Sequence, residues 1–146
     1  MNEVTFERPQ LIGFAGVALL IFGAFAPLIH LPIVGGISYV GNGRGDGIFV
    51  ILLAVASGVL LYLKRYDIVL ITAALAAGLC VFTFINFESR MSDIRSQMGD
   101  LNGNPFRGLA DAVVDSVGLD WGWALLLLGI IGLFAGALMG RKTVTV

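Results

Sequence analysis

Four aspartates near the ends of apolar segments are the side chains best placed for chemistry. Asp46 and Asp120 each stand just before an apolar stretch, and Asp111 and Asp115 lie in a polar stretch. Carboxylates that converge can hold a cation or another ligand. An aspartate at a helix start also accepts hydrogen bonds from free backbone N–H groups and complements the helix dipole. Capping alone accounts for Asp46 and Asp120, so a shared outer ligand site of all four is the second hypothesis.

The single histidine and the single cysteine fit structural roles. His30 ends an apolar segment beside Pro32, and a bis-histidine haem would need a second histidine. A structural zinc site usually needs four Cys or His ligands. Cys80 lies in an apolar stretch, where a thiolate is disfavoured, and membrane thiol–disulfide exchange needs cysteine pairs. We therefore expect no metal site and no cofactor.

The stretch from Asp100 to Asp111 resembles a calcium-binding loop only in part. Asp100, Asn102 and Asn104 have the alternating spacing of such a loop, and Asp111 occupies its twelfth position. Pro105 stands where the loop needs glycine, and its last ligand is normally glutamate. A turn is the better interpretation.

Motifs of catalysis and ion transport are missing from the sequence. It has no P-loop, no HExxH and no serine–histidine arrangement. Its apolar segments contain no buried Asp, Glu, Lys or Arg, the residues that usually carry protons or ions across a membrane. We therefore assign no catalytic residue and expect a non-enzymatic protein.

Four apolar segments determine the solvent in which this chain folds. A bilayer span needs roughly 20 mostly apolar residues, and the segments that reach or approach this length are residues 11–29, 46–63, 68–87 and 121–140. Of the 146 residues, 58% are hydrophobic and 13% are charged, with a mean hydropathy of +0.93. The sequence predicts one integral membrane domain over residues 1–146, an all-α bundle of four transmembrane helices. Residues 24–26 have the small-x-small form of a signal-peptide cleavage site, but no basic region precedes the segment, so an uncleaved span is favoured.

Basic residues indicate the orientation of the predicted bundle. Those expected on one side, in short segments, are Arg8, Lys64, Arg65, Arg141 and Lys142. The other side has four arginines spread over two longer connections, which together with Asp46 hold seven carboxylates. Because basic density in short loops sets topology, both termini are expected in the cytoplasm and residues 30–45 and 88–120 outside.

The two outer connections are expected to form a small cap. Glycine pairs and an Asn-Gly step indicate a short β-hairpin over residues 31–43. Residues 88–101 contain good helix formers and can prolong the third helix. Apolar residues recur at helical spacing over residues 107–117, which is typical of a short amphipathic helix. The cap therefore holds the hairpin and one or two helices over residues 88–118.

Small residues at four-residue spacing predict close helix packing. In lipid, backbones that approach closely over such residues replace the hydrophobic drive between helices. The residues expected to pack helices together, or to pair two copies of the chain, are Ala54, Gly58, Ala74, Gly78, Gly132, Gly136 and Gly140. Trp121 and Trp123 are expected to anchor the fourth span at the outer interface, where indole rings prefer to lie.

Five stretches of the chain form a recognisable pattern: FERPQLIGFAGVALLIFGAFAPLIHLPIVG, GNGRGDG, FTFINFESRMS, NPFRGLAD and DWGWALL. This pattern resembles a family of small bacterial four-span membrane proteins, especially cyanobacterial ones, whose members are described as uncharacterised. The resemblance covers nearly the whole chain and implies a bacterial inner or plasma membrane location with no known activity. The layout of a short and a longer outer loop is also similar to tetraspanins, in topology only, because their loop cysteines are missing here.

The sequence favours a protein that acts by contact. The hypothesis is an accessory or scaffold subunit of a membrane complex, or a homo-oligomer, whose partners are the bilayer and a protein or second copy. The alternative is a small channel, transporter or carrier of a neutral or apolar ligand, with Asp46 and Asp120 at its vestibule. A third interpretation, a haem or quinone oxidoreductase, would show in a visible spectrum. The net charge of −1 gives no case for nucleic acid.

Overall fold

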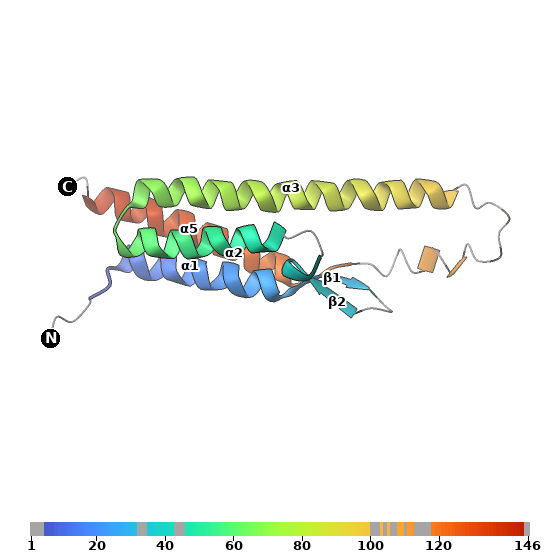
Figure 1. Cartoon of the computed structure of the whole chain (residues 1–146), viewed down its shortest axis with the longest axis horizontal. Helices are drawn as coiled ribbons and strands as arrows, with labels where there is room; N and C mark the ends of the chain where they lie inside the picture. The colour runs from blue at the N-terminus through green and yellow to red at the C-terminus, as the bar shows by residue number, and fades with distance from the viewer. Residues whose placement is uncertain are drawn as a thin grey trace.

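Four long helices and a small sheet make up the described part of the computed structural model (Figure 1). The structure describes residues 5–31, 35–42, 46–99, 103, 105, 108–109, 111–112 and 118–144. The elements follow in the order α1 (Arg8–Phe25), β1 (Pro27–Leu31), β2 (Gly35–Ser38), the 3-10 helix η1 (Val40–Asn42), α2 (Asp46–Tyr62), α3 (Tyr66–Gly99), β3 (Gly118–Leu119) and α5 (Gly122–Val144).

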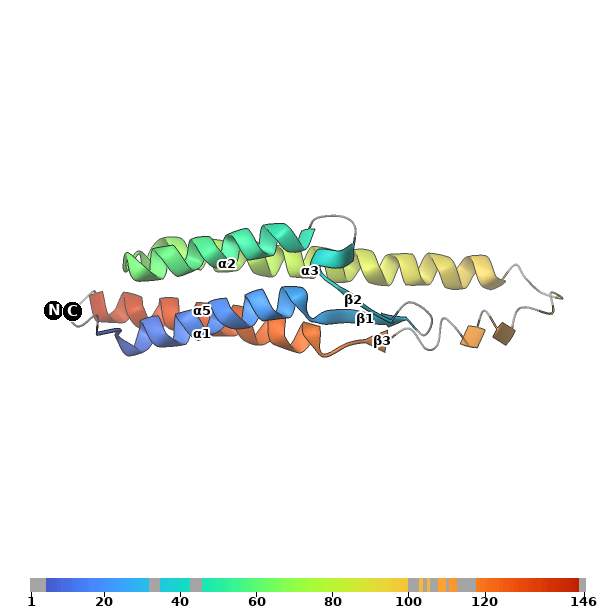
Figure 2. The same ribbon diagram turned by 60° about the horizontal axis from the view of Figure 1, so that its bottom comes forward.

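Each long helix packs against two others, so the four form a closed ring. α1 contacts α2 and α5, and α3 contacts the same two helices. Both termini lie at one end of the bundle, which we call the termini end, and the strands lie at the other, the sheet end (Figure 2). The turn between α2 and α3 is also at the termini end (Figure 1).

Three helices, α1, α3 and α5, are long and apolar enough to cross a membrane. α2 is equally apolar in character but has 17 residues, a length of about 26 Å at 1.5 Å per residue. The predicted helical bundle is therefore confirmed, and three of its helices have the length and composition of spans. The crossing of a membrane stays a prediction for all four helices, and α2 is the one that falls short in length.

The first helix ends at Phe25, so the predicted limit at residue 29 is wrong. Ala26 has φ −68° and ψ 150°, the extended conformation that a residue before proline prefers. Pro27 then begins β1, which occupies the last residues of the predicted span. An apolar run alone cannot separate a helix from a buried strand that follows it directly.

The strands form an antiparallel sheet in the order β2-β1-β3. The pairing of β1 with β2 confirms a hairpin, with Ile29 opposite Ile37 and His30 opposite Gly36. Its strands lie earlier in the chain than the predicted range of residues 31–43, at Pro27–Leu31 and Gly35–Ser38. β3 pairs with the other edge of β1, where Ile29 lies opposite Leu119. This strand has two residues and no detectable alternation, which explains why the sequence did not predict it.

α3 continues well beyond the other helices. It has 34 residues, about 51 Å, and residues 88–99 form a segment that projects past the sheet end of the bundle (Figures 1 and 2). We call this the projecting segment. The good helix formers of this stretch thus extend the third helix as expected. Of the predicted amphipathic helix over residues 107–117, the structure describes residues 108–109 and 111–112, all helical, and the rest lies outside the described residues.

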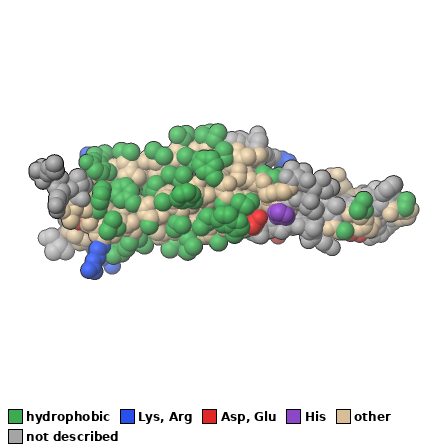
Figure 3. Space-filling view, turned by 90° about the horizontal axis from the view of Figure 1, so that it is seen from below, with side chains coloured by type: hydrophobic (Ala, Val, Ile, Leu, Met, Phe, Trp, Pro, Cys, Tyr) green, Lys and Arg blue, Asp and Glu red, His purple; other side chains and the backbone are tan. Residues whose placement is uncertain are grey.

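Hydrophobic side chains cover the outside of the bundle. They extend over the helices between Lys and Arg side chains near the termini end and acidic side chains and His30 toward the sheet end (Figure 3). Exposed aliphatic and aromatic residues occur on all four helices, including Phe22, Leu52, Ile71 and Ile131. A continuous apolar exterior of this kind is what a lipid-facing surface requires.

Candidate functional site

One buried tyrosine closes the sheet end of the bundle. Tyr39, between β2 and η1, is fully buried. Its hydroxyl lies 2.6 Å from Oγ1 of Thr83 and donates to the carbonyl of Leu79 at 3.3 Å. Burial raises the pKa of Tyr39 to about 12, so the hydroxyl stays protonated at neutral pH. The connection after β2 is therefore fixed to α3 by one side chain.

The start of α2 packs directly on the same connection. A Cβ atom on Gly47 would lie 2.6 Å from the backbone carbon of Tyr39 and 2.6 Å from the nitrogen of Val40. Only glycine allows two backbones to approach this closely. Asp46 is the first residue of α2, which agrees with its predicted place at the helix start.

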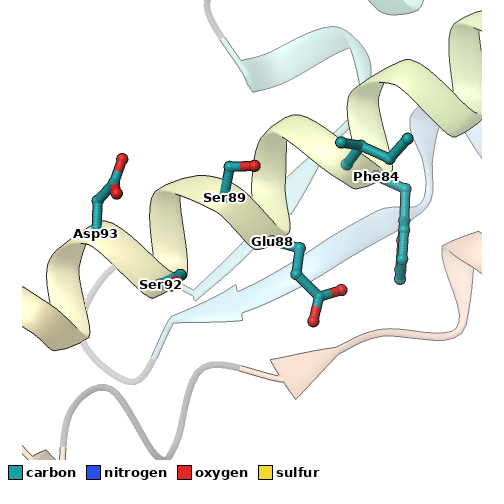
Figure 4. A pocket seen from close by; sticks show the side chains of 6 residues that line it. Phe84, Glu88, Ser89, Ser92 and Asp93 are labelled. Atoms are coloured by element: carbon teal, nitrogen blue, oxygen red, sulfur yellow. The ribbon is translucent and has the colours of Figure 1, made fainter.

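A groove lies along α3 where the helix leaves the bundle. It has a volume of about 390 Å³, and the described residues that line it are Phe84, Ile85, Glu88, Ser89, Ser92 and Asp93. Phe84 and Glu88 point from α3 toward the side on which the strands lie (Figure 4). Two carboxylates and two hydroxyls on an open wall can accept and donate hydrogen bonds to another chain.

An aromatic pair supports the bundle end of this groove. Phe84 and Trp123 meet edge to face, with ring centroids 5.5 Å apart and an interplanar angle of 89°. The indole nitrogen of Trp123 is buried and, in the part of the chain described, has no hydrogen-bond partner. Trp121 is 58% exposed at the start of α5. The two tryptophans thus differ: Trp121 has the exposure that an interface anchor needs, whereas Trp123 packs against α3.

Of the predicted carboxylate site, the structure brings Asp120 beside a histidine. Oδ2 of Asp120 lies 3.8 Å from Nδ1 of His30, and its Oδ1 accepts a hydrogen bond of 2.8 Å from the backbone N–H of Trp121. Asp111 is exposed, and Asp115 lies outside the described residues. No group of three or more His, Cys, Asp or Glu among the described residues could hold a metal ion.

No sequence pattern pairs His30 with Asp120, because they lie 90 positions apart along the chain. The pair forms because β3 lies beside β1: His30 is opposite Gly118, and the N–H of Asp120 donates to the carbonyl of Leu28 at 2.9 Å. The short strand that positions this pair carries no signal of its own.

The glycines of α5 face other helices of the same chain. A Cβ on Gly132 would lie 3.0 Å from Cα of Gly16, and one on Gly136 would lie 2.7 Å from the nitrogen of Gly13. Gly140 packs against the ring of Tyr66. This face of α5 is covered within the chain, so it is not available to a second copy.

The small residues of the other two helices divide between the inside and the outside. Ala54 is fully buried, and Gly58 lies under Val17 of α1. Ala74 and Gly78 are exposed on α3. A packing role for the glycines of α1 was not predicted from the sequence. Gly13, Gly16 and Gly23 nevertheless follow each other at helical spacing, which could have indicated the α1–α5 contact.

Most buried polar groups inside the described bundle form hydrogen bonds. The hydroxyls of Ser57 and Thr72 lie 2.6 Å apart and join α2 to α3. The side-chain amide of Gln10 donates to the carbonyl of Leu61 at 3.0 Å. The buried hydroxyl of Tyr66 has no hydrogen-bond partner among the described residues. These groups are separate, so they do not make a continuous polar path through the described bundle.

Comparison with known proteins adds no relative to this geometry. Searches against protein-family models, curated proteins and solved structures found no match for the chain. The resemblance to small four-span bacterial proteins therefore stays an expectation.

Proposed function

We propose that this chain is a multi-pass membrane protein that acts by contact, as an accessory or scaffold subunit of a membrane complex or as a homo-oligomer. The projecting segment of α3 is the observation that carries this proposal. It extends past the bundle as a regular helix and has a polar groove at its base. Helices of this length gain most of their stability from packing, so a segment whose described side chains are mostly exposed suits a partner protein.

The packing of the bundle interior supports a contact role over transport of ions. The core consists of buried aliphatic side chains, among them Leu20, Leu61, Leu126 and Leu133. The α1–α5 seam is closed by glycines whose backbones touch. In the proposed orientation, the termini are cytoplasmic and the projecting segment is outside, which follows from the placement of basic residues.

Site-specific photo-crosslinking in native membranes tests the proposal. A photoreactive phenylalanine analogue at Ser92, in the groove, should yield a defined crosslinked product. The same analogue at Thr143, which is exposed near the termini end, serves as the matched control and should not. Mass determination in mild detergent completes the test. A monodisperse monomer, with no crosslinked product at Ser92 and no co-purifying protein, would contradict the proposal.

A second candidate function rests on an apolar groove between α2 and α3. Its volume is about 570 Å³, and the residues that line it are Phe49, Leu52, Leu53, Ala56, Leu75 and Leu79. A carrier of a neutral or apolar ligand would need such a wall and no buried charge. Extraction of the purified protein with organic solvent should then release a stoichiometric apolar compound. Ala56→Phe should abolish its retention, whereas Gly78→Ala, outside the groove, should not.

A further inference from the structure

We propose that the termini end of the bundle binds the anionic headgroups of phospholipids in the adjacent leaflet. The surface is a rim of basic residues contributed by three places in the chain: the start of α1, the α2–α3 turn and the end of α5. We call it the basic rim, and its members are Arg8, Lys64, Arg65, Arg141 and Lys142. This inference does not depend on the proposed partner at the sheet end.

Ion pairs divide the basic rim into neutralised and available charges. Nζ of Lys64 lies 2.7 Å from Oε1 of Glu7, which raises the pKa of Lys64. Nε of Arg141 lies 2.7 Å from Oδ1 of Asp67. These pairs hold α1 to the turn and α5 to the start of α3. They also bring all parts of the rim together at one end.

Three cations of the rim are left without a carboxylate. Arg8, Arg65 and Lys142 are exposed, and none of them takes part in an ion pair among the described residues. Each lies within three residues of an exposed apolar side chain. Leu11 stands three residues after Arg8, Leu63 two before Arg65 and Met139 three before Lys142. Long basic side chains at the edge of an apolar belt reach the depth of lipid phosphates.

The α2–α3 turn holds a basic residue, Lys64, in a backbone conformation that is strained for a residue with a side chain. Lys64 has φ +56°, in the left-handed region. Helices usually end on glycine in this conformation, because a side chain is strained there. The turn is nevertheless well formed: the N–H of Lys64 donates to Leu61 at 3.1 Å, and that of Arg65 to Leu60 at 2.9 Å. It therefore presents two consecutive basic residues at a fixed place.

The charges at the two ends of the bundle favour an anionic lipid as the molecule that binds the basic rim. The described residues of the sheet end include Arg90 and three carboxylates, Glu88, Asp93 and Asp120, so this end is more acidic than the basic rim and would repel an anionic headgroup. The basic rim is instead continuous with the apolar belt that would lie in the bilayer (Figure 3). An anionic lipid matches both surfaces at once, since its chains cover the belt and its phosphate meets the unpaired cations.

Lipid retention in native mass spectrometry tests the inference. The full chain is placed in nanodiscs with equal amounts of phosphatidylglycerol and phosphatidylcholine and then released. The wild type should retain phosphatidylglycerol preferentially. Arg8→Gln, Arg65→Gln and Lys142→Gln should each reduce that preference by about fivefold, the factor expected for one basic residue near an anionic surface. Arg90→Gln, at the opposite end on α3, is the matched control and should leave it unchanged.

Charge-preserving variants separate binding from folding. Arg8→Lys, Arg65→Lys and Lys142→Arg combined should retain the wild-type preference. Millimolar inorganic phosphate should not displace the retained lipid. The inference is overturned if wild type retains the two lipids equally, if the glutamine variants retain the wild-type preference, if the charge-preserving variant loses it, or if Arg90→Gln weakens it as much. Displacement by phosphate would also overturn it, since it would identify a site for the free anion.

Discussion

Because Tyr39 is buried at the sheet end, its ionisation should make the stability of the protein depend on pH. Its pKa is raised to about 12 by burial, whereas an unfolded tyrosine titrates near 10. Between pH 10 and 12 the unfolded chain therefore binds fewer protons than the folded chain, and stability falls as the pH rises. The expected loss is at most about 1.4 kcal/mol per pH unit in this window, with none below pH 10.

Chemical unfolding in detergent at pH 9, 10 and 11 measures this loss. Tyr39→Phe should be less stable than wild type at pH 9 by about 1 kcal/mol, because the bond to Thr83 is gone. The variant should then lose less stability than wild type on going to pH 11. Parallel pH profiles for the two proteins would mean that Tyr39 is not buried as described.

A glycine-to-alanine substitution is expected to destabilise the protein at Gly16, in the α1–α5 seam, but not at Gly78, on the exposed face of α3. A Cβ on Gly16 would lie 2.6 Å from the nitrogen of Leu133 and 2.7 Å from the carbonyl oxygen of Gly129. Because both are backbone atoms, Gly16→Ala must push α1 and α5 apart, at a cost of about 1–3 kcal/mol or more.

Gly78→Ala is the matched control on α3, where the new methyl would meet no described atom within 4 Å. Its unfolding midpoint should equal or slightly exceed that of wild type, since alanine favours a helix over glycine. Equal midpoints for Gly16→Ala and wild type would show that the two helices are not in backbone contact.

The α3 helix is the element whose two parts should behave differently. Its first part packs against α2 and α5, whereas the described side chains of the projecting segment are mostly exposed. Amide hydrogen exchange in detergent should therefore be slow over residues 69–84 and at least about 100-fold faster over residues 92–99, because local opening costs less where few apolar contacts break.

A helix-breaking substitution tests whether the projecting segment is needed for contact. Ser89→Pro, with the photoreactive residue kept at position 92, removes a backbone donor and disrupts the helix locally, at about 3 kcal/mol. It should abolish the crosslink from position 92 but leave membrane insertion and the exchange of residues 69–84 unchanged. Ser89→Ala with the same photoreactive residue should preserve the crosslink and the slow exchange. Loss of slow exchange throughout α3 would show that the two parts do not separate.

Helix existence followed from the sequence, but helix ends followed only in part. Length and apolar content are properties of a whole segment, so a single residue within it does not change the prediction of a helix. The end of α1 depends instead on Pro27, whose preceding residue must leave the helical conformation. The continuation of α3 to Gly99 was expected from the good helix formers of residues 88–101, which are polar and lie beyond the apolar pattern. Both boundaries were visible in residue types, though not in hydropathy.

The contacts of the candidate site required tertiary structure. Four-residue spacing predicted that Gly132 would pack closely but could not identify Gly16 as the partner, since one such pattern serves contacts within or between chains. Tyr39 gave no sequence signal, because a tyrosine in a connection is ordinarily exposed or interfacial. Its burial depends on the backbone that Gly47 allows to approach.

At the scale of the whole molecule, the ends of the bundle differ in charge and in shape, and this difference predicts one orientation. The termini and the α2–α3 turn share the basic rim, and the strands and the projecting segment share the other end (Figure 2). If all four helices cross the bilayer, both termini lie on one side. If α2 does not cross, the turn near Arg65 and the terminus near Lys142 lie together on the side opposite to Arg8, and the two termini lose their common side.

Cysteine labelling in intact cells distinguishes these arrangements. The one native cysteine, Cys80, is buried in α3, and Cys80→Ala gives a background without thiols. Single cysteines are then introduced at Arg8, Arg65, Ser92 and Lys142, all of which are exposed. A membrane-impermeant maleimide should label only position 92 in intact cells and all four after permeabilisation, because basic short segments are retained in the cytoplasm. Labelling at 65 and 142 but not at 8 in intact cells would mean that α2 fails to cross.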